Sequence, residues 1–187
     1  MRRAVSVSLF LSLAFFIAAG ARAQEFDPRY VLSPGDYLEI SVWKDESLSR
    51  ELIVPPDGVI SFPLIGDIDA RGLTVTSLRE KISEKLSEYV PDVTVTVVLN
   101  QAVSLKAYVI GKVNNPGEFP INLETTVAQV LSMAGGLNAF ASEDSILIIR
   151  RQGGETVKIP FDYGELKKGR NLQQNIVIQR GDVVVVP

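Results

Sequence analysis

The sequence predicts an α+β protein of two small β-rich modules, each a mixed sheet with one main helix. Short alternating runs, such as residues 37–43, recur between Pro- and Gly-rich turns, which is the pattern of strands. One helical pattern begins at Thr74 and a shorter one at Thr126, so each half has one helix among its strands. We therefore place the modules at residues 24–102 and 103–187.

A turn, a set of strands and a helix make up the first module. Pro34 presets φ and Gly35 permits a positive φ, so a turn is expected just before Asp36. Strands are expected at residues 37–43, 51–54, 59–63, 65–69 and 93–99. The helix has its N-cap at Thr74 and ends before Pro91, and its apolar stripe consists of Val75, Leu78, Ile82, Leu86 and Tyr89.

The second module repeats this arrangement. Thr126 and Gln129 form a predicted capping box, and Gly135-Gly136 ends the helix that follows. Gly153-Gly154 predicts a hairpin turn. Gly181-Asp182 precedes the last strand as Gly35-Asp36 precedes the first, which indicates similar architecture rather than duplication. Strands are expected at residues 105–110, 146–150, 156–161 and 182–187.

Residues 1–23 have the order of a secretory signal peptide. A positive start at Arg2 and Arg3 is followed by an apolar run over residues 4–19 and a small-x-small site that ends at Ala23. The run is shorter than the roughly 20 residues that span a bilayer. We therefore expect cleavage after Ala23 and a processed protein outside the cytoplasm.

Composition excludes several classes of function. The chain has 22 acidic and 19 basic residues, a balance that disfavours nucleic-acid binding. It has no cysteine and no histidine, which excludes disulfides and most zinc, iron or copper sites, thiol chemistry and His-based triads. Residues 24–102 carry 14 acids and 7 bases, whereas residues 103–187 carry 8 and 9, which suggests head-to-tail contact between copies. We expect no catalytic residue, cofactor or metal.

The order of these motifs resembles the polysaccharide biosynthesis/export family. In the first module the matching positions are Pro34, Gly35, Asp36, Trp43, Gly58, Pro63, Gly66 and Thr74. The second module is similar to the soluble-ligand-binding β-grasp (SLBB) domain at Gly111, Pro116, Gly117, Gly135, Gly136, Gly181 and Asp182. The resemblance implies a β-grasp-like second module and a structural rather than catalytic role for these positions.

The resemblance also implies a function and partners. A ring-shaped homo-oligomer in the periplasm would pass polysaccharide from an inner-membrane chain-length or tyrosine-kinase protein toward the outer membrane. The chain has no lipidated cysteine and stops at Pro187 on a strand, so we expect a separate outer-membrane β-barrel partner. The alternative is a periplasmic adaptor that binds a glycan or a protein without forming a pore.

Two acidic residues raise the possibility of an enzyme. Asp67 and Asp69 would share one strand face, and paired carboxylates can hydrolyse glycosides. The simpler interpretation, a solvated strand face, is favoured. The acid pairs Asp45-Glu46 and Glu143-Asp144 are interpreted as loop acids.

Three other features have a functional and a structural interpretation, and the structural one is favoured for each. Trp43 could stack on a sugar, but core or interface packing is expected. Gly135-Gly136 follows a helix, whereas phosphate-binding loops precede one. A basic tract could meet an acidic polysaccharide or an acidic neighbouring subunit, but ordinary solvated faces are expected for Arg150, Arg151, Lys158, Lys167, Lys168 and Arg170.

Overall fold

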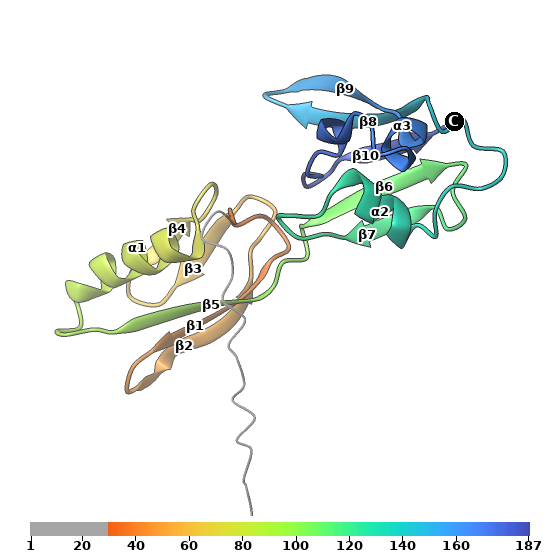
Figure 1. Cartoon of the computed structure of the whole chain (residues 1–187). Coiled ribbons are helices and arrows are strands. Elements are labelled where there is room, and N and C mark those ends of the chain that lie inside the picture. Colours follow the sequence, from red (N-terminus) through yellow and green to blue (C-terminus); the bar gives the residue numbers. More distant parts are fainter. Residues whose placement is uncertain (1–29) are drawn as a thin grey trace, which may run out of the picture.

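The computed structural model describes residues 30–187, so the predicted signal peptide lies outside the described residues. The described chain forms two β-rich modules joined by a short connection, which confirms the α+β class (Figure 1). Each module has its own hydrophobic cluster. One cluster is built from buried residues between Tyr30 and Leu99, and the other from buried residues between Ala107 and Val186.

The first module combines a three-stranded sheet, a two-stranded hairpin and one long helix. Its elements are β1 (Tyr37–Val42), β2 (Asp45–Ile53), β3 (Val59–Phe62), β4 (Gly66–Asp69), α1 (Val75–Ser87) and β5 (Val95–Gln101). The sheet order is β2-β1-β5, and β3 pairs with β4. All of these pairs are antiparallel. In the pair of β1 and β5, the first residue of β5, Val95, lies beside the last residue of β1, Val42. Among the described strands, the predicted mixed pairing is therefore confined to the second module.

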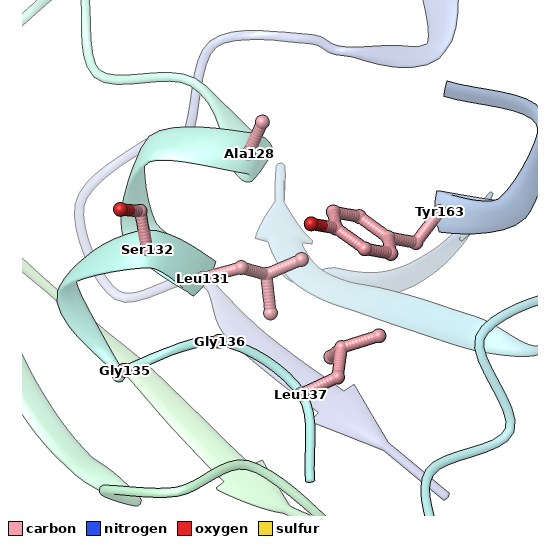
Figure 2. Close-up of a pocket in the computed structure, with 7 residues that line it drawn as sticks. All are labelled: Ala128, Leu131, Ser132, Gly135, Gly136, Leu137 and Tyr163. Carbon is pink, nitrogen blue, oxygen red and sulfur yellow. The ribbon is translucent and has the colours of Figure 1, made fainter. Parts of the chain in front are cut away.

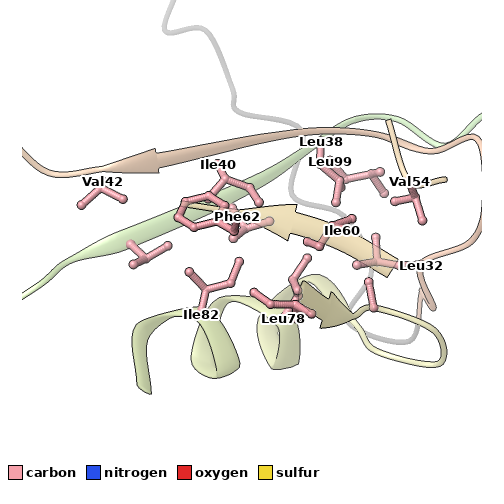
Figure 3. Packing of buried hydrophobic residues seen from close by; sticks show 14 of the residues in the cluster. Leu32, Leu38, Ile40, Val42, Val54, Ile60, Phe62, Leu78, Ile82 and Leu99 are labelled. Atoms are coloured by element: carbon pink, nitrogen blue, oxygen red, sulfur yellow. The ribbon is translucent and has the colours of Figure 1, made fainter. Parts of the chain in front are cut away.

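Helix α1 closes the core of the first module. The Thr74 side chain accepts a hydrogen bond from the Ser77 N–H at 3.2 Å, which confirms the predicted N-cap. Leu78 and Ile82 of α1 point toward the sheet, with Phe62 of β3 between them and β1 (Figure 3). The helix thus buries Leu78, Ile82 and Leu86 of the predicted stripe. Tyr89 was wrongly included, because it lies beyond the end of the helix and is 57% exposed.

The second module is a five-stranded mixed sheet with the order β7-β6-β10-β8-β9. Strand β10 runs parallel to β6 and antiparallel to β8. Strand β7 was not predicted from the sequence. The elements are β6 (Lys106–Gly111), β7 (Gly117–Pro120), α2 (Val127–Met133), β8 (Ile146–Gln152), β9 (Glu155–Phe161), α3 (Tyr163–Lys167), the 3₁₀ turn η1 (Leu172–Gln174) and β10 (Val183–Val186).

The predicted helix ends and the predicted hairpin of this module are present. The Gln129 side chain accepts a hydrogen bond from the Thr126 N–H at 2.8 Å at the start of α2. At its end, the N–H groups of Gly135 and Gly136 donate to carbonyls of the last turn at 3.0 and 2.9 Å, which forms a Schellman motif. A two-residue loop, Gly153-Gly154, joins β8 to β9.

On the three central strands β6, β10 and β8, both faces of the second sheet carry apolar side chains, but only one face is covered by helices. Helix α2 packs on the face that includes Val109, Ile148 and Val184. The opposite face, called here the open sheet face, belongs to neither hydrophobic cluster and is partly exposed in the described chain. It consists of Tyr108, Ile110, Leu147, Ile149, Val183 and Val185. Sheets with one solvated face normally place polar residues there, so this face has the composition of a buried surface.

Gly111 provides a test of the packing between β6 and β10. A Cβ at Gly111 would lie 2.0 Å from the Val186 carbonyl oxygen, and its φ is +95°. Gly154 is a matched control, because its φ is +89° but a Cβ there would meet nothing within 4 Å. We expect Gly154→Ala to cost about 1–2 kcal/mol of unfolding free energy from backbone strain alone. Gly111→Ala should cost at least about 1 kcal/mol more because of the collision. Equal losses in urea denaturation would contradict this packing.

Candidate functional site at the junction of the two modules

The first turn contains a buried aspartate. Asp36 is fully buried, and its carboxyl oxygens accept hydrogen bonds from the Tyr30 hydroxyl at 2.6 Å and the Ser33 N–H at 2.9 Å. A third bond comes from the Ser104 N–H at 3.3 Å. Gly35 turns the chain with a φ of +92°, which brings Asp36 back over Ser33. Asp36 therefore joins the start of the module to the connection between the modules.

The second turn has the same construction. Asp182 is buried, and its side chain accepts from the Gln179 N–H at 2.8 Å, three residues before it, as Asp36 accepts from Ser33. Here the partner that neutralises the acid is Arg150 of β8, whose Nη2 lies 2.6 Å from a carboxylate oxygen. The weak similarity between the two Gly-Asp pairs in the sequence thus corresponds to the same hydrogen-bonded turn.

The two turns meet. Arg180, just before Gly181, donates a hydrogen bond to the Ser33 hydroxyl and another to the Ser104 hydroxyl, the latter at 3.3 Å. Ser104 also shares a hydrogen bond of 2.9 Å with the Tyr30 hydroxyl. These contacts place predicted motif residues from opposite ends of the described chain at one junction.

Sequence reasoning missed several of these partners. It did not assign Ser33, Ser104 or Arg180 to a site, and it grouped Arg150 with a solvated basic tract. A signal for Arg150 was available, because it continues the inward-facing alternation of Ile146 and Ile148. An arginine on an apolar strand face requires a buried acid, which here is Asp182.

The other predicted motif positions lie at turns and element ends away from the junction. They occupy the β3–β4 hairpin (Gly58, Pro63, Gly66), the N-cap of α1 (Thr74), the end of β6 (Gly111), the entry to β7 (Pro116, Gly117) and the end of α2 (Gly135, Gly136).

Trp43 does not pack in the core. It lies at the tip of the β1–β2 hairpin with 72% of its surface exposed, so core packing was the wrong expectation. Strand alternation explains the difference, because the inward positions of β1 end at Val42. Packing against another molecule stays a prediction.

A hollow of about 350 Å³ lies beside α2 (Figure 2). Tyr163 of α3 points its ring across this hollow toward Leu131 of α2, above Leu137. The predicted motif pair Gly135-Gly136 forms part of the wall. Among the described residues of the wall none has a charged side chain, so the hollow suits a small apolar or hydroxyl-bearing group.

The acid pair of β4 has the wrong environment for glycoside hydrolysis. Asp67 and Asp69 are both exposed. The Arg71 side chain binds the Asp69 carboxylate at 2.9 and 2.7 Å and, with its backbone N–H, lowers the pKa of Asp69 to about 2. A general acid requires a raised pKa instead. These features favour the solvated strand face.

The basic tract is divided among separate partners. Arg150 binds Asp182, Lys167 binds Glu143 at 2.5 Å, and Lys168 and Arg170 contact Glu165. The side chains of Arg151 and Lys158 form no hydrogen bond or ion pair within residues 30–187. Asp45 and Glu46 were expected in a loop but lie at the start of strand β2, because only two residues separate it from β1. The Asp45 carboxylate accepts hydrogen bonds from Ser47, which lower its pKa.

Within the described chain, no group of three or more acidic side chains is arranged to hold a metal ion. No helix among residues 30–187 combines the length and the apolar character needed to span a bilayer.

Comparison with known proteins identifies the class. Residues 24–100 match the family model described as polysaccharide biosynthesis/export protein, and residues 106–160 match the SLBB domain. The chain belongs to the polysaccharide biosynthesis/export family.

Curated relatives agree with this assignment. The polysialic acid transport protein KpsD of Escherichia coli is 30% identical over 67% of this chain and 23% of its own length. The EPS I polysaccharide export outer membrane protein EpsA of Ralstonia nicotianae is 32% identical over 85% of this chain and 41% of its own. The capsule polysaccharide export outer membrane protein CtrA of Neisseria meningitidis is 25% identical over 83% and 43%. The chain thus spans less than half the length of these relatives.

Tyr30 predicts a pH dependence of stability. Burial, followed by the hydrogen bond to Asp36, raises the pKa of Tyr30 from 10.0 to about 12. Because the folded-state pKa is the higher one, this contribution is complete below pH 10 and disappears as the pH rises toward 12. It should amount to roughly 2–3 kcal/mol. The unfolding free energy of the native protein should therefore fall more steeply over this range than that of Tyr30→Phe.

Tyr89→Phe is the control for this measurement, because Tyr89 is 57% exposed. Urea denaturation from pH 9 to 12 gives the comparison. A Tyr30→Phe variant with the same pH slope as the native protein would contradict the proposed environment of Tyr30.

Asp69 provides a test of the enzyme hypothesis. Carboxyl ¹³C NMR should find the pKa of Asp69 at about 2 in the native protein. Arg71→Ala should raise it toward the ordinary value of about 3.9, because the principal hydrogen bonds are lost. A native pKa above 5 would instead favour a general acid at this position.

Proposed function

We propose that this chain is a non-catalytic periplasmic component of an apparatus that exports capsular or extracellular polysaccharide across the outer membrane. The observation that carries this proposal is the match of both modules to the domains of an export family. The names of the relatives, which include polysaccharide export outer membrane proteins, also support a role in polysaccharide export. The predicted signal peptide agrees with a periplasmic site next to the outer membrane.

The open sheet face supports assembly into a homo-oligomer. Six apolar side chains on three adjacent strands, β6, β10 and β8, lie outside both cores of the described chain. Covering them with another copy would remove this surface from water at about 25 cal/mol per Å². The first sheet differs, because its outer face carries Glu39, Ser41 and Thr96. This polar face suits the wall of a hydrated passage.

The remaining partners follow from the same proposal. An inner-membrane chain-length or kinase protein would supply the polymer, and a separate outer-membrane β-barrel would complete the path. The boundary at residues 102/103 would divide an export domain from an SLBB domain. The exposed Trp43 would contact a neighbouring molecule.

The second candidate function is a periplasmic adaptor that binds a glycan or a protein without forming a pore. The hollow beside α2 favours it, because it has the size of a small ligand site. Self-assembly separates the two functions, since the adaptor would bind its ligand as a monomer.

Val185→Asp tests assembly and function together. The new charge lies in the middle of the open sheet face and should reduce oligomerisation at least about tenfold, because it would be buried without a partner. Val98→Asp is the matched control, since Val98 is exposed on the outer face of β5 in the first module. Sedimentation velocity measures the assembly.

The same variants should differ in cells. In a strain that lacks the gene, polymer should accumulate behind the outer membrane. Native protein and Val98→Asp should restore surface polysaccharide, whereas Val185→Asp should not. Full export without the gene would refute the proposed function, and normal assembly of Val185→Asp would refute the role of this face.

A further inference from the structure

A second hollow, of about 450 Å³, lies where the two modules meet. Tyr30 and Val31 line it from the start of the first module. Arg151 of β8 and the turn residues Gln179 and Arg180 line it from the second module. Its volume falls within the range of small-ligand sites, and it is formed by residues of both modules.

Two arginines line this hollow and form no ion pair with an acid of residues 30–187. Arg151 is exposed, and its side chain forms no hydrogen bond or ion pair among residues 30–187. Arg180 binds only the hydroxyls of Ser33 and Ser104 through Nη1, so within the described chain its Nε and Nη2 hydrogens have no acceptor. By contrast, Arg150 and Arg170 are paired with carboxylates. Within the described chain, the hollow thus has two guanidinium groups that form no ion pair with a carboxylate.

The rest of the lining defines what would fit beside these cations. No acidic side chain is among the described residues of the wall. Leu105, Leu123 and Val177 supply apolar surface, and the Gln179 side chain offers an amide donor and acceptor. A guanidinium fork matches a carboxylate in geometry and charge. The apolar wall matches the C–H face of a sugar ring, and the Gln179 amide can form hydrogen bonds with its hydroxyl groups.

We propose that this junction hollow binds the carboxylate-bearing sugar units of an acidic polysaccharide, with Arg151 and Arg180 as the carboxylate ligands. The inference rests on the proposed function and names the substrate class. The site is weak, because exposed guanidinium groups are screened by salt and solvent. Weak binding suits a conduit, since each sugar unit has to be released as the chain advances.

The test uses the purified protein and two probes, a galacturonic acid hexamer and the neutral maltohexaose. Titration followed by ¹H–¹⁵N NMR should move the signals of Arg151, Gln179 and Arg180 with the uronate and not with maltohexaose. Arg151→Gln should weaken uronate binding about tenfold, which corresponds to loss of one charge-assisted hydrogen bond. Arg180→Lys should also weaken it, because the charge is kept but the fork is lost.

Lys158→Gln is the matched control. Lys158 lies on β9, is exposed and does not line the hollow, and its side chain forms no ion pair within residues 30–187. Lys158→Gln therefore removes the same charge as Arg151→Gln at a position outside the hollow. It should bind the uronate as tightly as the native protein. Equal loss in Lys158→Gln and Arg151→Gln, or equal binding of maltohexaose, would overturn the inference.

The two proposals fail in different ways. A native protein that restores export in cells but binds no uronate would overturn this inference and leave the proposed function standing. Uronate binding that depends on Arg151, in a chain whose gene is dispensable for export, would support the site and refute the proposed function.

Discussion

Asp36 is an acid without solvent contact, and the way in which its oxygens are satisfied determines how the two modules are connected. Burying a polar group costs several kcal/mol unless hydrogen bonds replace the lost water. The replacements here come from Tyr30, Ser33 and Ser104, which lie before the turn, in the turn and in the connection between β5 and β6. One side chain therefore holds three segments, and Arg180 adds the turn of the second module to them.

The same turn has a different purpose in each module because its acid has different donors. Asp36 accepts from a hydroxyl and two N–H groups and connects segments across the junction. Asp182, just before β10, instead accepts from Arg150 of the neighbouring strand β8 and from the Gln179 N–H. Exposed Asp69 is held by a neighbouring arginine that lowers its pKa. These three acids act as hydrogen-bond acceptors that organise the chain.

Local patterns in the sequence predicted local structure well. The N-cap at Thr74, the Gly-Gly end of α2 and the hairpin at Gly153-Gly154 depend on residues within a few positions, and all three are present. Contacts between distant residues could not be predicted. Nothing near Arg180 in the sequence indicates Ser33, which lies 147 positions away. Strand β7 was not predicted because this short edge strand is defined by its pairing with β6 and not by a pattern in its own four residues.

The position of β10 has a consequence for how the protein acquires its structure. Strands β6 and β8 do not pair directly but are both hydrogen-bonded to β10. Until residues 183–186 arrive, the module has two separate ribbons and no continuous sheet. Closure over such sequence separation is slow, because loop entropy is lost before the contacts form. In a polypeptide threaded through a secretion channel, the second module would thus lack its complete sheet until residues 183–186 had emerged.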